Sequence, residues 1–97
     1  MTPEGQLKKL ILDWLKWQPN CYVRLIQIGG IAGRKNSSSG ISDIIGAWRG
    51  KALAIEVKTP KGVLSEGQEL FLEAWARAGG IAIVARSLED VTKRLCP

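Results

Sequence analysis

Residues 41–59 read ISDIIGAWRGKALAIEVKT, and this stretch decides the fold. Its two halves, 41–48 and 51–59, are rich in apolar and β-branched residues, which is typical of strands. Arg49-Gly50 stands between them, where a glycine favours a tight reversal of the chain. The stretch therefore predicts a β-hairpin.

The turn position also predicts the register of this hairpin. A turn of two or four residues centred between Arg49 and Gly50 pairs residues whose numbers sum to 99. Asp43 then lies directly opposite Glu56, and Lys58 shares their face because side chains alternate along a strand. The other residues of the second strand are Leu53, Ile55 and Val57 on a buried face, and Ala52 and Ala54 on the face of Glu56, where they leave room for a ligand.

Two carboxylates that oppose each other on a sheet repel one another unless a cation lies between them. Lys58 can serve as a plain counter-ion for Asp43 and Glu56. The alternative is a divalent cation held by both carboxylates and a backbone oxygen, since Mg²⁺ needs only one or two carboxylates and takes its other ligands from water and phosphate. The basic charge around this pair favours the metal.

Working outward, the rest of the chain predicts helices and strands in the order α-β-β-β-α-β-α. The predicted elements outside the hairpin are a helix that opens at Thr2-Pro3 and ends at Pro19-Asn20, a strand at 22–28, a long flexible loop at 29–40, a helix at 65–78 closed by Gly79-Gly80, a strand at 81–86 and a short helix from Ser87 to about Leu95. We expect an α/β fold in one domain over residues 1–97.

The net charge of +5 is concentrated in one part of the chain. The segment from Arg24 to Lys61 holds seven basic and two acidic residues, so it carries the whole excess. A solvated basic face is one interpretation, and a polyanionic partner such as nucleic acid is the other. The concentration in one segment favours nucleic acid.

Several residue types are scarce, and this excludes classes of chemistry. The chain has no histidine, which excludes catalytic triads and metal sites that use imidazole. Cys21 and Cys96 are far apart and are expected to be reduced, half-buried thiols. No apolar run is long enough to span a membrane and no secretion signal is visible, so we expect a soluble, cytoplasmic protein.

The glycine-rich segment 29–35 lacks the Gly-Lys-Ser/Thr of a phosphate-binding loop, so no nucleotide cofactor is expected. It is better interpreted as a flexible basic arm along DNA phosphates. The candidate DNA-binding residues are Arg24, Arg34, Lys35, Ser37, Ser38 and Lys61. The four tryptophans are expected in the core or in dimer contacts, with Trp17 the most exposed.

Three stretches, GISDIIG at 40–46, AIEVKTPKG at 54–62 and Leu64-Ser65 to Gln68, resemble the VRR-NUC (virus-type replication-repair nuclease) domain. That domain belongs to the PD-(D/E)XK nuclease superfamily, whose restriction-endonuclease-like core has the order αβββαβ, with a mixed central sheet flanked by helices. The resemblance covers nearly the whole chain, including residues 79–82. One residue departs from it, because Ser42 stands where the family usually has proline.

The resemblance implies roles for the acidic pair and its neighbours. Asp43 and Glu56 would bind Mg²⁺ or Mn²⁺, with the Val57 carbonyl as a third ligand. Lys58 would orient or activate the attacking water and stabilise the charge that develops on the phosphate.

Two further residues match the family and also have simpler explanations. Glu4 would reach the metal or a second ion, but an acid in the first turn of a helix also complements the helix dipole. Gln68 matches a glutamine beside the active site, but Ser65-x-x-Gln68 also forms a capping box.

The resemblance therefore implies a metal-dependent DNA endonuclease that hydrolyses phosphodiester bonds. Stand-alone members look like homodimers that act on branched DNA, similar to Holliday-junction resolvases. The alternatives are a catalytically inert DNA-binding module with a degenerate nuclease fold, and a flap or duplex nuclease without junction preference. A purely structural subunit is disfavoured by the basic segment.

Overall fold

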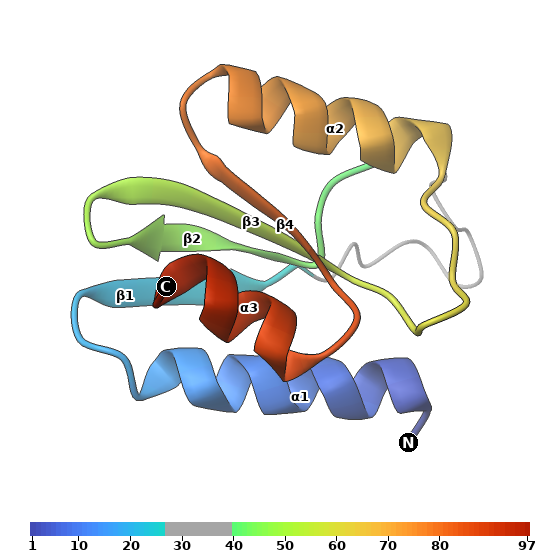
Figure 1. The fold of residues 1–97 in the computed structure, drawn as a ribbon, viewed down its shortest axis with the longest axis horizontal. Helices are drawn as coiled ribbons and strands as arrows, with labels where there is room; N and C mark the ends of the chain where they lie inside the picture. Colours follow the sequence, from blue (N-terminus) through green and yellow to red (C-terminus); the bar gives the residue numbers. More distant parts are fainter. Residues whose placement is uncertain (27–39) are drawn as a thin grey trace.

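The computed structural model describes residues 1–26 and 40–97 (Figure 1). Their elements follow the predicted order, which confirms the α/β fold. The elements are α1 (Pro3–Lys16), β1 (Cys21–Leu25), β2 (Ile44–Trp48), β3 (Lys51–Val57), α2 (Glu66–Arg77), β4 (Ile81–Ala85) and α3 (Leu88–Leu95). None of the helices in these residues is long and apolar enough to cross a membrane.

The strands form one mixed sheet in the order β1-β2-β3-β4. The first three are antiparallel, and β4 returns parallel to β3 after α2. Ile44 pairs with Ile55 and Trp48 with Lys51, which confirms the predicted register. Arg49 and Gly50 both have positive φ, at 48° and 87°, as a two-residue type I′ turn requires.

Helices cover both faces of the sheet (Figure 1). α1 and α3 lie on one face, where their apolar stripes bury Ile11, Leu15 and Val91 against Leu53 and Ile55. α2 lies on the other face and packs over β3 and β4. The sheet is thereby enclosed around β3, the strand that carries Glu56.

This arrangement corrects one expectation about the face of Glu56. The sequence predicts open room for a ligand at Ala54, but the exposed fraction of this residue is 0% because α2 covers this part of the sheet. Ala52 is exposed, as expected. Ala54 therefore leaves no room for a ligand on this face of β3.

The strands are shorter than predicted. β2 begins at Ile44 instead of residue 41, because the chain bends at Asp43. β3 ends at Val57 instead of residue 59, where the Lys58 N–H bonds the Ala85 carbonyl and Pro60 follows. β1 is Cys21–Leu25 instead of 22–28. The end of that predicted strand and nearly all of the predicted loop at 29–40 lie outside the described residues.

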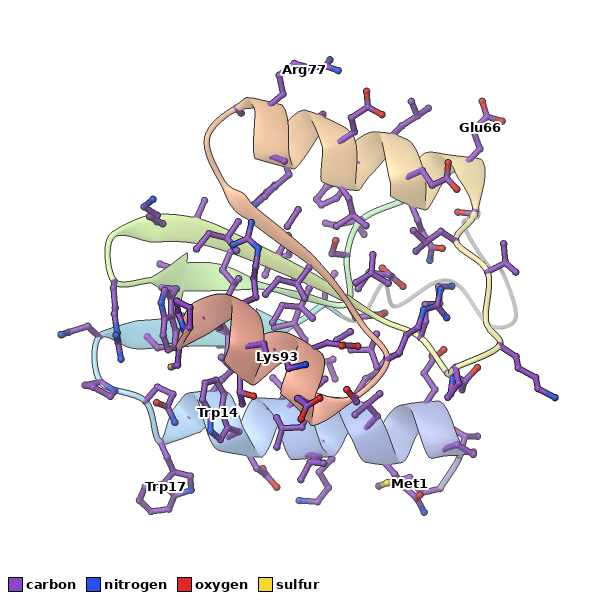
Figure 2. All side chains as sticks on the ribbon, in the orientation of Figure 1. Met1, Trp14, Trp17, Glu66, Arg77 and Lys93 are labelled. Carbon is purple, nitrogen blue, oxygen red and sulfur yellow. The ribbon has the colours of Figure 1, made fainter. Side chains whose placement is uncertain are left out.

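The tryptophans and cysteines mostly follow expectation. Trp17 is 87% exposed and points away from the body of the protein (Figure 2). Trp14 stacks on the buried Trp48, with their ring centroids 6.0 Å apart. Both cysteines are free thiols, although Cys96 is exposed instead of half-buried.

Candidate active site

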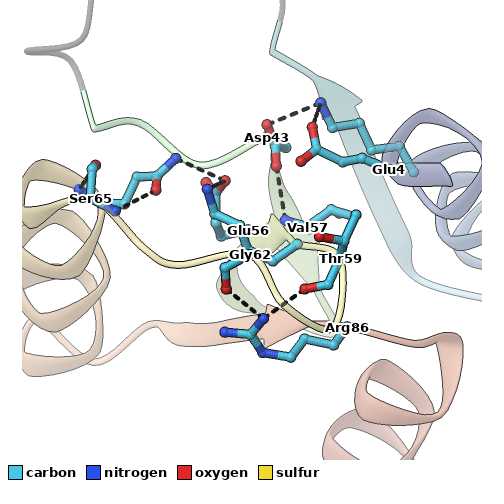
Figure 3. Close-up of polar contacts among 11 residues, drawn as sticks. Glu4, Asp43, Glu56, Val57, Thr59, Gly62, Ser65 and Arg86 are labelled. Carbon is cyan, nitrogen blue, oxygen red and sulfur yellow. Dashed lines mark hydrogen bonds and ion pairs between the residues drawn. The ribbon is translucent and has the colours of Figure 1, made fainter. Parts of the chain in front are cut away.

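The predicted acidic pair lies where β2 begins and β3 ends, at one end of the sheet (Figure 3). The antiparallel register brings these two strand ends together. The first turns of α1 and α2 border the same place, through Glu4 and Ser65. The β2-β3 hairpin and two helices far from each other in sequence thus meet around Asp43 and Glu56.

Both oxygens of Asp43 contact hydrogen-bond donors. Its Oδ2 accepts a hydrogen bond from the Val57 backbone N–H at 2.8 Å. Its Oδ1 lies 3.4 Å from the Lys8 ammonium on α1. Sequence analysis missed Lys8, because nothing in the sequence indicates which residue of α1 would come to lie beside the start of β2.

Glu56 is almost fully enclosed, with 2% of the residue exposed. Its Oε2 accepts a hydrogen bond from the Gln68 amide Nε2 at 3.0 Å and lies 4.0 Å from the Lys58 ammonium. Its Oε1 is buried and has no hydrogen-bond partner among the described residues. A buried carboxylate oxygen without a partner is costly unless it takes up a proton or a cation.

The surroundings of Glu56 disfavour its negative charge. Burial, and next the neighbouring Asp43 carboxylate, raise the pKa of Glu56 from 4.5 to about 8, against the opposing effect of Lys58 and Lys8. Burial lowers the pKa of Lys8, but Asp43 and Glu4 outweigh it and the net change is upward. Without another cation, Glu56 is therefore largely protonated at neutral pH and Lys8 remains charged.

Gln68 has both of the roles considered for it from the sequence, because it caps α2 and also contacts Glu56. Its Oε1 accepts a hydrogen bond from the Ser65 N–H at 2.9 Å, and the Ser65 hydroxyl accepts one from the Gln68 N–H at 3.1 Å. This is the predicted capping box at the start of α2. The other end of the same amide donates to Glu56. The cap therefore holds the amide in place for the carboxylate.

Among residues 1–26 and 40–97, Glu4 reaches the site only through Lys8. Its Oε2 lies 3.3 Å from the Lys8 ammonium, one helical turn away. Within the part of the chain that the structure describes, Glu4 does not join Asp43 and Glu56 in a group of three acidic side chains that could hold a metal ion. A direct role for Glu4 on a metal stays a prediction.

Two backbone features shape the rim of the site. Gly40 has a positive φ of 55°, and a Cβ there would collide with the Gly67 carbonyl in the first turn of α2. A glycine thus lets the segment before Asp43 pack closely against α2. Ser42 replaces the proline usual in the family; it is 1% exposed and its hydroxyl has no partner among the described residues.

Arg86, at the end of β4, holds the loop that follows Lys58 (Figure 3). Its Nη1 donates to the carbonyls of Thr59 and Gly62, both at 2.7 Å. Sequence analysis missed this contact, since the two segments are 24 residues or more apart in the chain. Arg86 thereby fixes the path of the backbone immediately after Lys58.

The candidate DNA-binding residues are only partly described. Arg24 is exposed on β1 and donates to the Tyr22 hydroxyl, and Lys61 is exposed on the loop held by Arg86. Arg34, Lys35, Ser37 and Ser38 lie outside the described residues. The assignment of all six to DNA stays a prediction.

The residues present fit a divalent cation. Asp43 and Glu56 supply carboxylate oxygens side by side, and Glu56 Oε1 has no hydrogen-bond partner among the described residues. Hard oxygen ligands of this kind suit Mg²⁺ or Mn²⁺. A cation bound there would also offset the repulsion that raises the pKa of Glu56.

Comparisons with known proteins agree with this fold. The family model described as VRR-NUC domain matches residues 2–89. A solved structure titled "VRR_NUC domain" is 23% identical with a TM-score of 0.71, covering 96% of this chain and 94% of its own. Another, titled "VRR_NUC domain protein", is 21% identical with a TM-score of 0.69, covering 96% of this chain and 84% of its own. No curated protein matches the sequence. The chain belongs to the VRR-NUC family, whose domain is a nuclease of the PD-(D/E)XK type.

Proposed function

We propose that this chain is a metal-dependent endonuclease that hydrolyses phosphodiester bonds of DNA. The observation that carries the proposal is the pairing of the half-buried Asp43 with the buried Glu56, which has an unpartnered oxygen among the described residues and Lys58 beside it. Such an oxygen needs a proton or a cation, and a divalent cation would serve both carboxylates. The proposal takes residues 1–97 as one nuclease domain.

Asp43, Glu56 and the Val57 carbonyl would hold Mg²⁺ or Mn²⁺. When bound, such a cation lowers the pKa of a bound water and stabilises negative charge on phosphate oxygens. The Val57 N–H, by bonding Asp43 Oδ2, fixes the orientation of that carboxylate. Gln68 does the same for Glu56 through Oε2, which leaves Oε1 available to a cation.

Lys58 would act on the reacting phosphate. Its ammonium is half-buried, 4.0 Å from Glu56, on the loop whose course Arg86 fixes. From there it would orient the attacking water and neutralise the charge that develops on the phosphate. A charge acts more strongly in such a partly enclosed site than in open solvent.

We further propose that the enzyme acts on branched DNA as a homodimer. Two-fold symmetry would match the symmetry of a four-way junction, and a second copy would supplement a small core. Arg24 and Lys61, together with Arg34, Lys35, Ser37 and Ser38, would contact DNA phosphates. All six lie in the basic segment from Arg24 to Lys61, which also contains Asp43 and Glu56.

The test is cleavage of an end-labelled four-way junction and of its matching linear duplex in Mn²⁺ and in Mg²⁺. Wild type, Glu56→Gln and the control Glu73→Gln, an exposed residue at the far end of α2, are compared. We expect wild type and the control to cut the junction and Glu56→Gln to be inactive. Binding of both DNAs without cutting would support an inert DNA-binding module, and equal cutting of both would support a duplex nuclease.

A further inference from the structure

We propose that Lys8 is a built-in competitor of the metal, so that this nuclease loads its cation poorly until DNA is bound. The inference rests on the proposed metal site and assigns a function to a residue outside it. The lysine ammonium lies 3.4 Å from Asp43 Oδ1, an oxygen that the carboxylate could otherwise offer to a cation.

The two carboxylate oxygens of Asp43 make different kinds of contact. Oδ2 is held by the directed hydrogen bond from the Val57 N–H, which is enough to orient the carboxylate. Oδ1 has the longer ion pair with Lys8, at 3.4 Å. The Val57 N–H can therefore orient Asp43 without Lys8, and Lys8 contacts the oxygen that no directed hydrogen bond holds.

Lys8 also has a second ion-pair partner. Glu4, one turn earlier on α1, lies 3.3 Å from the same ammonium and is more exposed than Asp43, at 42% against 21% of its side chain. A glutamate four residues before a lysine is the favourable order for such a pair on a helix. Glu4 thus offers Lys8 a partner when Asp43 turns to the metal.

The competition has an electrostatic cause. A divalent cation on Asp43 and an ammonium a few ångströms away repel each other, and this repulsion weakens metal binding. A DNA phosphate at the site supplies negative charge to both cations and removes the penalty. Metal and DNA then each raise the affinity for the other, as reciprocal coupling between two ligands requires.

The test is calorimetric titration with Mn²⁺, without DNA and with a junction whose scissile phosphates are phosphorothioates. Lys8→Gln removes the charge, Lys8→Arg keeps it, and Lys9→Gln is the control on the exposed side of the same helix. Without DNA, we expect Lys8→Gln to bind Mn²⁺ on the order of ten-fold more tightly than wild type, Lys8→Arg and Lys9→Gln. With DNA bound, the difference should largely vanish.

Two results would overturn the inference. Unchanged Mn²⁺ affinity in Lys8→Gln would mean that Lys8 does not compete, and weaker binding would mean that it positions Asp43. In either case Mn²⁺ binding by wild type and its loss in Glu56→Gln leave the proposed function standing. Absence of Mn²⁺ binding by wild type, with and without DNA, would refute both.

A double-mutant cycle separates this scheme from direct ligation by Glu4. If Glu4 acts by holding Lys8, Glu4→Gln weakens Mn²⁺ binding in the wild-type background and has no effect in Lys8→Gln. If Glu4 is itself a metal ligand, Glu4→Gln weakens Mn²⁺ binding equally in both backgrounds. Glu4 is then not free to pair with Lys8 when the metal binds, which contradicts the proposed role of Lys8.

Discussion

Replacement of Glu56 by glutamine should reduce the loss of folding stability that the wild type undergoes as pH rises. In the wild type, burial and Asp43 raise the pKa of Glu56 from 4.5 to about 8. Between these two values the folded state holds a proton that the unfolded state has lost. The free energy of unfolding therefore decreases as pH rises through this window. Glutamine stays neutral throughout, and its amide can donate to Asp43.

The size of the effect follows from the same pKa. A difference of one pH unit corresponds to about 1.4 kcal/mol, so the change from 4.5 to about 8 limits the loss to about 5 kcal/mol. Relaxation of the site and water entry would lower this figure. Even about 2 kcal/mol is a large part of the stability of a small domain and would shift its Tm by roughly 8–16 °C.

The assay is urea denaturation in chelator at a series of pH values from about 5 to about 9. Wild type should lose stability as pH rises from about 5 to about 8, whereas Glu56→Gln should lose much less over the same range and should exceed wild type above about pH 8. Glu73→Gln should retain the wild-type slope. Addition of Mn²⁺ should stabilise wild type at alkaline pH and hardly affect Glu56→Gln.

Equal slopes for wild type and Glu56→Gln would refute the reasoning, because the carboxylate would then be solvated in solution. Marked destabilisation of Glu56→Gln at every pH in chelator would also contradict it. That result would make Glu56 a structural ion-pair partner of Lys58 and not half of a metal site.

Three other substitutions test the rim of the site. Arg86→Gln removes the charged donor to the Thr59 and Gly62 carbonyls. It should lower the free energy of unfolding by about 1.5–3 kcal/mol in urea denaturation and should slow single-turnover cleavage. Unchanged cleavage would mean that this loop does not position Lys58. Gly40→Ala places a Cβ against the first turn of α2 at a positive φ, and should lower stability by about 1–3 kcal/mol by the same assay; a neutral result would mean that the backbone moves freely there. Ser42→Ala removes a buried hydroxyl without a described partner, so Tm should be unchanged or higher, and a clear fall would reveal a hidden partner.

Local patterns are enough to predict the elements and the hairpin register. The Arg49-Gly50 turn fixes which residues pair, because a two-residue turn admits one alignment of its strands, and the observed pairing of Ile44 with Ile55 follows from it. The capping box at Ser65 is local for the same reason, since it involves residues within one turn of helix. Turn geometry and side-chain alternation alone therefore place Asp43 beside Glu56.

Contacts between distant elements are beyond the reach of such patterns. Whether α2 covers Ala54, whether Lys8 reaches Asp43 and whether Arg86 holds the loop after Lys58 all depend on how helices pack on the sheet. Periodicity shows that a helix has an apolar face, but not which strand that face meets or how far along it lies.

The sequence by itself determined the acidic pair, its lysine and the strands that carry them, because turns and side-chain alternation act over a few residues. Only the tertiary structure decided the state of that pair. Packing of α2 buries Glu56, and packing of α1 brings Lys8 to Asp43. The charge of a carboxylate depends on the water and the ions around it, and in this site both are set by elements distant in the chain.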